Sequence, residues 1–273
     1  MEPKDLLVHL DSGARVEERL RLAASLAHRH GARLTGLFAE SPTLGSSLLG
    51  RRDPAAIAQA AAEAKARLDA AGGAAGVATR FWQLAGEESV DVVDAVVICC
   101  RRVDLAIFGQ QQGDDAPVPE GLVERVIAGC GRPVLVVPSV GSYPETGKRV
   151  LVAWTGSREA ARALHDALPL LERAETVVVL ALQTPTEGAD VSGLPPVDLV
   201  DHLATHGIRA SYDRWLVGEL SAVDAVLNRA SDEGADLTVI GAYGIGAGPF
   251  AADRHGTTRA ILETMTTPVL LSC

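Results

Sequence analysis

Residues 103–109 read VDLAIFG and residues 235–241 read ADLTVIG, so one strand-like segment occurs twice in the chain. Two further segments repeat in the same order: KDLLVHLD at 4–11 is answered by KRVLVAWT at 148–155, and GRPVLVVP at 131–138 by TTPVLLSC at 266–273. The repetition indicates that the 273 residues are two tandem copies of one fold.

Each copy alternates short apolar runs with longer helical patterns, which is typical of βαβ units around a parallel sheet. The run DLLVHL at 5–10, for example, suits a strand buried on both faces, and apolar residues recur at helical spacing over 15–30. Because crossovers between parallel strands are right-handed, we expect an α/β protein with a five-stranded, doubly wound parallel sheet in each copy. Strands are expected at 5–10, 32–39, 77–84, 103–109, 133–138, 149–154, 175–182, 208–217, 236–241 and 268–272, and helices at 15–30, 55–71, 88–101, 119–130, 157–173, 195–206, 220–234 and 256–266.

The segment SVGSYPETGK at 139–148 contains Gly, Ser and Pro and joins the two copies. We therefore expect two domains, at 1–142 and 147–273, each of ordinary domain size.

Composition excludes several classes of protein. A net charge of −10 argues against nucleic-acid binding, which needs a basic surface. No apolar run approaches the roughly 20 residues that span a bilayer, so no membrane partner is expected. The N-terminus lacks the pattern of a signal peptide, and the four cysteines show no CxxC spacing or disulfide framework. These features indicate a cytoplasmic protein with reduced thiols.

In doubly wound sheets, ligands bind beyond the carboxyl ends of the strands, where the strand order reverses. After the first strand of each copy stand Asp11 and Ser12, and Thr155 and Ser157. An aspartate there can accept hydrogen bonds from a ribose or an adenine amino group. The same residue types also cap helices, and capping needs no ligand.

The second candidate site follows the repeated strand of the second copy. Gly241 and Gly244 begin a glycine-rich loop, and Gly256, Thr257 and Thr258 open the next helix. Closely spaced glycines let backbone amides approach an anion, and a helix start adds free N–H groups. The alternative is a flexible surface loop. The equivalent loop of the first copy, GQQQGDDAP at 109–117, lacks the second glycine and carries two aspartates that would repel phosphate.

Taken together, these segments resemble the universal stress protein family. The resemblance rests on a strand ending in Asp-Ser-Gly, the late ADLTVIG strand, a Gly-x-x-Gly loop, Gly-Thr at a helix start and the closing TTPVLL strand. It covers nearly the whole chain, twice, and the tandem arrangement is similar to the two-domain members.

The resemblance implies pairing through the last strands, within the chain as a pseudo-dimer or across a homodimer. It also implies ATP or AMP as ligand, held by an aspartate after the first strand and a G-x2-G-x9-G-(S/T) loop. Gly241 and Gly244 match the first glycines, and Gly256 with Thr257 the last pair, with eleven intervening residues in place of nine. Thr155 replaces the aspartate in that copy, whereas Asp11 stands in the copy whose loop has decayed.

We therefore expect a non-catalytic stress-response protein that binds adenine nucleotide in its second domain, with Asp11 and Ser12 marking a vestigial pocket in the first. The alternatives are an interaction scaffold with two inactive sites, or a slow adenine-nucleotide hydrolase. His202 and His206, four apart on a helix, have a spacing that can hold a metal, but no third ligand is evident and a half-exposed helix explains them. No nucleophile–base pair nominates a reaction.

Overall fold

The computed structural model describes residues 2–40, 53–84, 91–111, 118–183, 199–216, 221–243 and 256–273. The chain divides into two compact units, Glu2–Glu145 and Thr146–Cys273. Each unit is an α/β domain with a five-stranded parallel sheet, which confirms the predicted fold class. We refer to them as the N-terminal and C-terminal halves.

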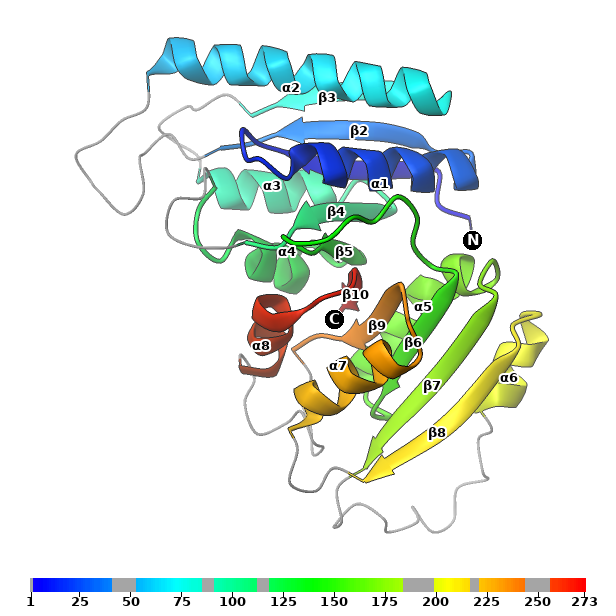
Figure 1. Ribbon diagram of the computed structural model, residues 1–273. Coiled ribbons are helices and arrows are strands. Elements are labelled where there is room, and N and C mark those ends of the chain that lie inside the picture. Colours follow the sequence, from blue (N-terminus) through cyan, green and yellow to red (C-terminus); the bar gives the residue numbers. More distant parts are fainter. Residues whose placement is uncertain are drawn as a thin grey trace. The chain divides into compact units, whose positions relative to one another are not determined.

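The N-terminal half has the strand order β3-β2-β1-β4-β5, and every strand pair described in it is parallel. Its strands are β1 (Asp5–Leu10), β2 (Arg33–Phe38), β3 (Thr79–Gln83), β4 (Leu105–Gly109) and β5 (Val134–Val137). Its helices are α1 (Val16–His30), α2 (Pro54–Ala75), α3 (Val92–Cys100) and α4 (Leu122–Cys130). Helix α1 packs against α2 and crosses in front of β1, whereas α3 packs against α4 (Figure 1).

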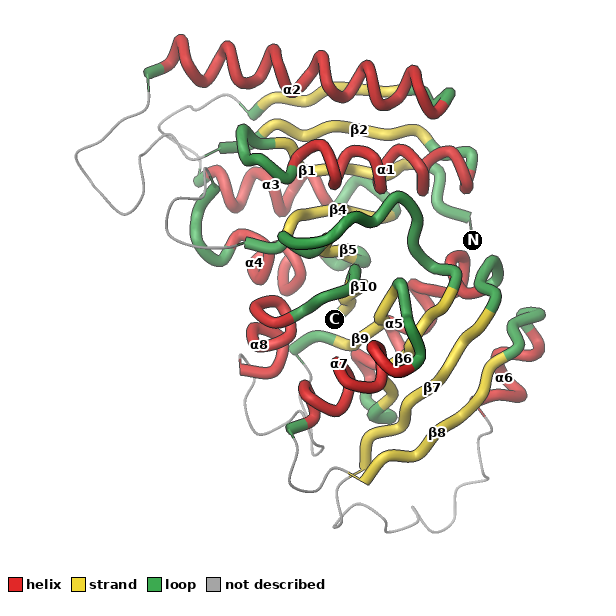
Figure 2. Tube along the Cα trace, viewed as in Figure 1, coloured by secondary structure: helices red, strands yellow, loops and turns green. Residues whose placement is uncertain are grey.

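The C-terminal half repeats this arrangement with the strand order β10-β9-β6-β7-β8. Its strands are β6 (Arg149–Trp154), β7 (Thr176–Gln183), β8 (Ala210–Leu216), β9 (Leu237–Gly241) and β10 (Val269–Ser272). Its helices are α5 (Arg158–Leu171), α6 (Leu199–Thr205), α7 (Ala222–Asp232) and α8 (Gly256–Thr264). Figure 2 shows the same alternation of strands, turns and helices in both halves.

The central strands are buried because helices cover both faces of each sheet. Every residue of β1 from Leu6 to Leu10 is buried, and so are all four residues of β5 and β10. A strand that is buried on both faces of the sheet needs a continuous run of apolar residues. In a strand that alternates apolar and polar residues, the polar side chains would all point into the apolar layer on one face. This explains why the sequence pattern located these strands to within two residues.

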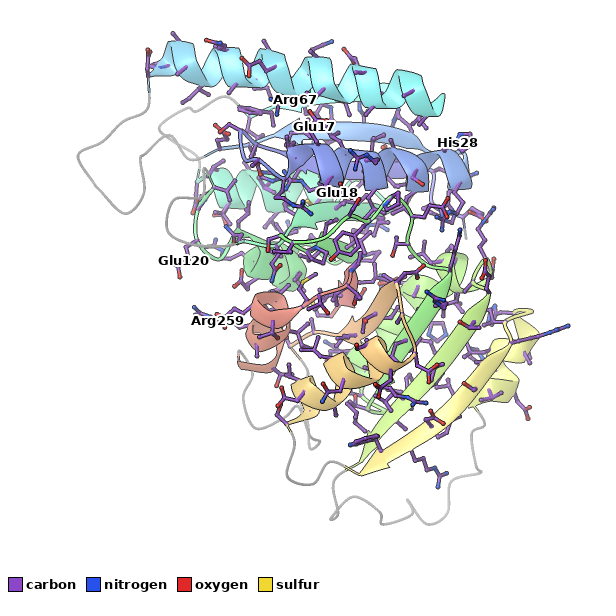
Figure 3. All side chains as sticks on the ribbon, in the orientation of Figure 1. Glu17, Glu18, His28, Arg67, Glu120 and Arg259 are labelled. Carbon is purple, nitrogen blue, oxygen red and sulfur yellow. The ribbon has the colours of Figure 1, made fainter. Side chains whose placement is uncertain are left out.

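Helices α1 and α2 are held together partly by an ion pair between Arg67 Nε and Glu17 Oε1 at 3.3 Å (Figure 3). The facing surfaces are rich in alanine, whose side chains are too short to fill the space between the helices. An open groove of about 440 Å³ remains there. It lies on the helix layer, not at the carboxyl ends of the strands.

Two carboxylates fix the segment that connects the halves, each within its own half. Glu18 of α1 accepts hydrogen bonds from the Ser142 hydroxyl at 3.0 Å and from the Tyr143 amide (Figure 3). Although burial by itself raises the pKa of Glu18, these hydrogen bonds bring it below the usual range. Asp236 accepts from the amides of Gly147 at 2.9 Å and Lys148 at 3.0 Å. The connecting segment is thereby tied to α1 in the N-terminal half and to the residue before β9 in the C-terminal half.

Among the described residues, no helix is long and apolar enough to cross a membrane.

Candidate functional site

The order of the strands defines one switch point in each half. From β1 the chain moves outward to β2 and β3, then returns to the other side of β1 as β4. The same reversal lies between β6 and β9. The gap between the carboxyl ends of these two strands is where doubly wound folds bind ligands.

At the N-terminal switch point, Asp11 follows β1 directly, and the residue as a whole is 8% exposed. Arg19 of α1 donates to it through Nη2 at 2.8 Å, and the amide of Gly13 donates to it at 2.9 Å. Arg19 is itself 4% exposed and also donates through Nε to the His9 carbonyl at 2.8 Å. Asp11 is therefore one partner of a buried, hydrogen-bonded ion pair inside the protein.

Burial would raise the pKa of Asp11, but the positive charge of Arg19 and the neighbouring His9 bring it below its usual value. Burial lowers the pKa of His9, which stacks on Phe108 with 5.2 Å between ring centroids. His9 Nε2 lies 2.8 Å from the Ala39 carbonyl, and because a carbonyl only accepts, this nitrogen carries the proton. The cluster thus holds one compensated pair of charges beside an imidazole that donates from Nε2 to a backbone carbonyl.

Arg19 also fills the space above the end of β4. A Cβ atom at Gly109 would overlap Nη1 of Arg19, so the guanidinium lies directly against this glycine. The amide of Ser12, the other residue predicted for this site, donates to the Glu40 carboxylate. The N-terminal switch point is therefore occupied by the protein's own cation, and the Asp11 carboxylate predicted to face a ligand is paired internally.

The C-terminal switch point has a different composition. Thr155 follows β6, and its hydroxyl lies 3.1 Å from the Ser157 hydroxyl. Ser157 accepts from the Ala160 amide at 3.1 Å and is the N-cap of α5. Gly156 between them has φ 70°, a conformation that favours glycine. Both predicted residues thus lie at the switch point, and Ser157 has a capping role that needs no ligand.

Gly241, the last residue of β9, has a structural reason to be glycine. A Cβ atom there would lie 2.5 Å from the Ala160 amide nitrogen and 2.5 Å from the Glu159 carbonyl carbon. The first turn of α5 therefore rests directly on the end of β9. Gly109 and Gly241 occupy equivalent positions, but a guanidinium lies over the first and helix backbone over the second.

The structure brings the end of β9 and the start of α8 together. Tyr243 has φ 55°, and it is the only residue other than glycine with positive φ in the described part of the chain. Its amide lies 3.4 Å from the hydroxyl of Thr258, which is buried. Gly256 and Thr257 form the partly exposed first residues of α8. Gly244 lies outside the described residues.

Arg19, which decides the state of the N-terminal switch point, was not among the residues predicted from the sequence. One signal was present in the sequence. Arg19 lies three residues after Val16, on the face of α1 that also carries Leu20 and Ala23. A charged residue at an inward-facing helix position requires a buried partner, and Asp11 is the acid at the adjoining strand end.

Comparison with known proteins shows which solved structures share this fold. No family model matches the sequence, and no curated protein matches it. The structure is similar to that of a universal stress protein from Archaeoglobus fulgidus DSM 4304, with a TM-score of 0.74 and 17% identity, over 100% of this chain and 96% of that one. It is also similar to a functionally unknown protein from Pseudomonas aeruginosa PAO1, with a TM-score of 0.56 and 15% identity, over 99% of this chain and 92% of that one.

Other matches cover one half only. A universal stress protein from Archaeoglobus fulgidus, solved in complex with dAMP, matches 50% of this chain and 98% of its own, with 20% identity and a TM-score of 0.37. A likeness at that level does not carry the ligand over to this chain. The full-length match does confirm, at the level of the fold, the resemblance predicted from the sequence: the chain has the α/β fold of a tandem universal stress protein.

Proposed function

We propose that the C-terminal half binds an adenine nucleotide, ATP or AMP, at the carboxyl ends of β6 and β9, and that the protein acts as a non-catalytic, nucleotide-responsive stress protein. One observation carries the proposal: the two switch points differ in what occupies them. Arg19 fills the N-terminal one, whereas the C-terminal one presents the Thr155 hydroxyl and the start of α8, which the buried Thr258 hydroxyl ties to the turn at Tyr243.

The phosphates would lie at the start of α8. The first amides of a helix have no partner within the helix, and the helix dipole places partial positive charge there. Gly256 leaves this backbone uncovered by a side chain, and Thr257 adds a hydroxyl donor. Thr258 holds the turn at Tyr243 against the helix, so that both segments border one site.

The nucleoside would lie on the Thr155 side. A threonine hydroxyl can both donate and accept, so Thr155 can replace the neighbouring Ser157 hydroxyl with a ribose hydroxyl as its partner. It brings no negative charge, which suits a ligand that is itself anionic. Asp11 at the equivalent N-terminal position is already neutralised by Arg19.

The second candidate is an interaction scaffold that works without nucleotide. The ion pair of Arg19 with Asp11 favours it, because that pair closes one of the two switch points to a ligand. The two proposals differ in one prediction: the first requires that the C-terminal half binds nucleotide, and the second requires that it does not.

Isothermal titration of the full chain, stripped of ligand, with ATP and with AMP tests the proposal. We expect a dissociation constant below 1 mM for at least one of them. Thr258→Val should weaken binding by about tenfold or more, since it removes the hydroxyl that holds the turn at Tyr243 against the start of α8. Thr264→Val, in the last turn of the same helix, is the matched control and should leave the affinity unchanged.

Absence of binding below millimolar nucleotide would contradict the proposal and favour the scaffold. Binding that is equal in Thr258→Val and in the unmodified protein would show that the site lies elsewhere. Phosphate release should stay at the buffer rate throughout. Slow ATP turnover that a change at Gly256 or Thr257 abolishes would instead indicate a hydrolase.

A further inference from the structure

The outermost strand of the C-terminal sheet, β8, leaves one edge open. It ends the order β10-β9-β6-β7-β8 and pairs with β7 over its whole length, from Ala210 to Leu216 (Figure 1). Within the described part of the chain, no backbone hydrogen bond joins β8 to any segment other than β7. Such an edge presents a row of N–H and C=O groups that can pair with another strand.

The side chains of β8 are exposed as well as its backbone. Tyr212 is 37% and Trp215 is 40% exposed, and both belong to the few large hydrophobic residues that are exposed among the described residues. In β3, the outermost strand of the N-terminal half, the aromatic residues Phe81 and Trp82 are more deeply placed. Edge strands that stay free commonly carry lysine, proline or a bulge, and β8 has none of these.

The charges along this edge favour a second strand with the same residues. Asp213 is paired with Arg229 of α7, so its charge is balanced within the chain. Arg209, directly before β8, and Arg214 are exposed and form no ion pair with the residues that the structure describes. The Arg214 guanidinium lies 5.9 Å from the centre of the Tyr212 ring. The edge thus offers guanidinium groups and aromatic rings, which attract each other, and a second copy offers both again.

The symmetry of a pair of identical strands decides which residues face each other. In an antiparallel pair, the residue on the two-fold axis faces its own copy, and residues at equal distances on either side face each other. With Tyr212 on the axis, the two tyrosine rings face each other, which favours stacking. Ser211 then faces Asp213 of the second copy, where a hydroxyl can donate to a carboxylate. Arg209 faces Trp215 of the second copy, which is a cation–π pair.

We propose that two copies of the chain associate through β8, as antiparallel strands with a two-fold axis at Tyr212. Pairing over residues 209–215 runs for about 24 Å and joins the two C-terminal sheets. An axis at Asp213 would place two carboxylates opposite each other, and one at Arg214 two guanidinium groups, and like charges destabilise a strand pair. The contact differs from the pairing through last strands that the family resemblance implies, because β8 and β10 lie at opposite ends of the sheet order.

Cysteine crosslinking of the full chain tests the position of the axis. In Tyr212→Cys the two introduced thiols face each other with Cα atoms about 5 Å apart, within reach of a disulfide. Diamide takes up the two thiol hydrogens as the S–S bond forms, and we expect a covalent dimer on a non-reducing gel. Ala210→Cys is the matched control, because its Cα atoms would lie about 14 Å apart, too far for a disulfide. The unmodified protein with diamide reports any bond made by the native cysteines.

Sedimentation equilibrium measures the association itself. A single pair of strands makes a small interface, so we expect a reversible dimer with a dissociation constant below about 100 μM. Tyr212→Lys brings two ammonium groups together on the axis and should weaken association by at least about tenfold. Ile98→Lys, at an exposed apolar residue of α3, is the control and should leave association unchanged. Circular dichroism checks that each variant is folded, which we expect because the substituted side chains are exposed.

Two outcomes would overturn the proposal. One is a chain that stays monomeric up to about 100 μM, which would leave the β8 edge to a strand from a different protein. The other is a dimer that Tyr212→Lys does not weaken and that Tyr212→Cys crosslinks no better than Ala210→Cys. That result would place the contact between the two copies on another surface.

Discussion

Replacement of Arg19 by methionine should destabilise the N-terminal half strongly. The side chains of Arg19 and Asp11 are 5% and 10% exposed, so the interaction is only weakly screened by water. Methionine removes the guanidinium and keeps a long apolar side chain over Gly109. The change leaves the Asp11 carboxylate buried with its charge uncompensated and the His9 carbonyl without its donor.

The magnitude follows from the burial of the pair. Removal of one partner of a buried, hydrogen-bonded ion pair costs about 3–5 kcal/mol. The loss of the bond to the His9 carbonyl adds about 1 kcal/mol. Asp11 retains the Gly13 amide as a donor, which keeps the total near the lower end, at about 4 kcal/mol.

Hydrogen exchange in urea, measured on peptides from the N-terminal half, reports the free energy of unfolding of that half alone. The double variant Asp11→Leu/Arg19→Met should recover most of the loss, because it removes both charges and leaves no carboxylate buried without a partner. A cost below 1 kcal/mol for Arg19→Met, or a double variant no more stable than the single one, would refute the account of Arg19.

The loss should also depend on pH. In the unmodified protein the folded-state pKa of Asp11 lies below its unfolded value of about 4, so the stability from the pair is fully present above about pH 4 and is lost as the pH falls through the folded pKa. In Arg19→Met the counter-charge is gone, and burial raises the pKa of Asp11 instead. The difference in stability between the two proteins should therefore shrink on acidification from pH 7 to pH 4.

The remaining predictions concern packing, capping and thiol reactivity. Gly241→Ala should lower the free energy of unfolding of the C-terminal half by about 1–3 kcal/mol, because the added Cβ overlaps the backbone of α5. The control is Gly73→Ala in α2, which has open space around it and should be neutral or stabilising, and urea unfolding measures both variants. Ser157→Ala should lower the stability of the C-terminal half by about 1 kcal/mol through loss of the α5 cap, measured by exchange of the first amides of that helix. Burial raises the pKa of both Cys99 and Cys100, and it raises that of the more deeply buried Cys100 more strongly. Iodoacetamide at pH 8 should therefore alkylate Cys99 first, and mass spectrometry of the digested protein measures the order.

The fold was predictable from the sequence because its information is local. Apolar runs such as DLLVHL and VDLAIFG mark strands that are buried on both faces, and their recurrence fixes the order of elements in both halves. Helix ends were predicted less closely: α2 ends at Ala75, not at 71, and α3 begins at Val92 after its N-cap Asp91. The start predicted for α6, at 195, lies outside the described residues. Propensity and periodicity fade over the last turn of a helix, where caps and tertiary contacts decide the boundary.

The candidate sites were predictable only in outline, because their state depends on contacts between distant segments. Asp11 alone predicts either a ligand-facing carboxylate or a helix cap; its pairing with Arg19 depends on how α1 lies over β4. Gly241 alone predicts a phosphate loop; its packing role depends on the approach of α5. Of these residues, only Arg19 is marked in the sequence, by its inward-facing position in the helical period of α1.

The central claim is that one half of the chain binds nucleotide and the other is closed by Arg19. Native mass spectrometry of the ligand-stripped full chain, titrated with ATP, counts the bound nucleotides directly. We predict one ATP per chain at saturation, retained in Ser12→Ala and reduced in Thr258→Val. Two ATP molecules per chain would contradict the closure of the N-terminal switch point, and none would contradict the nucleotide site of the C-terminal half.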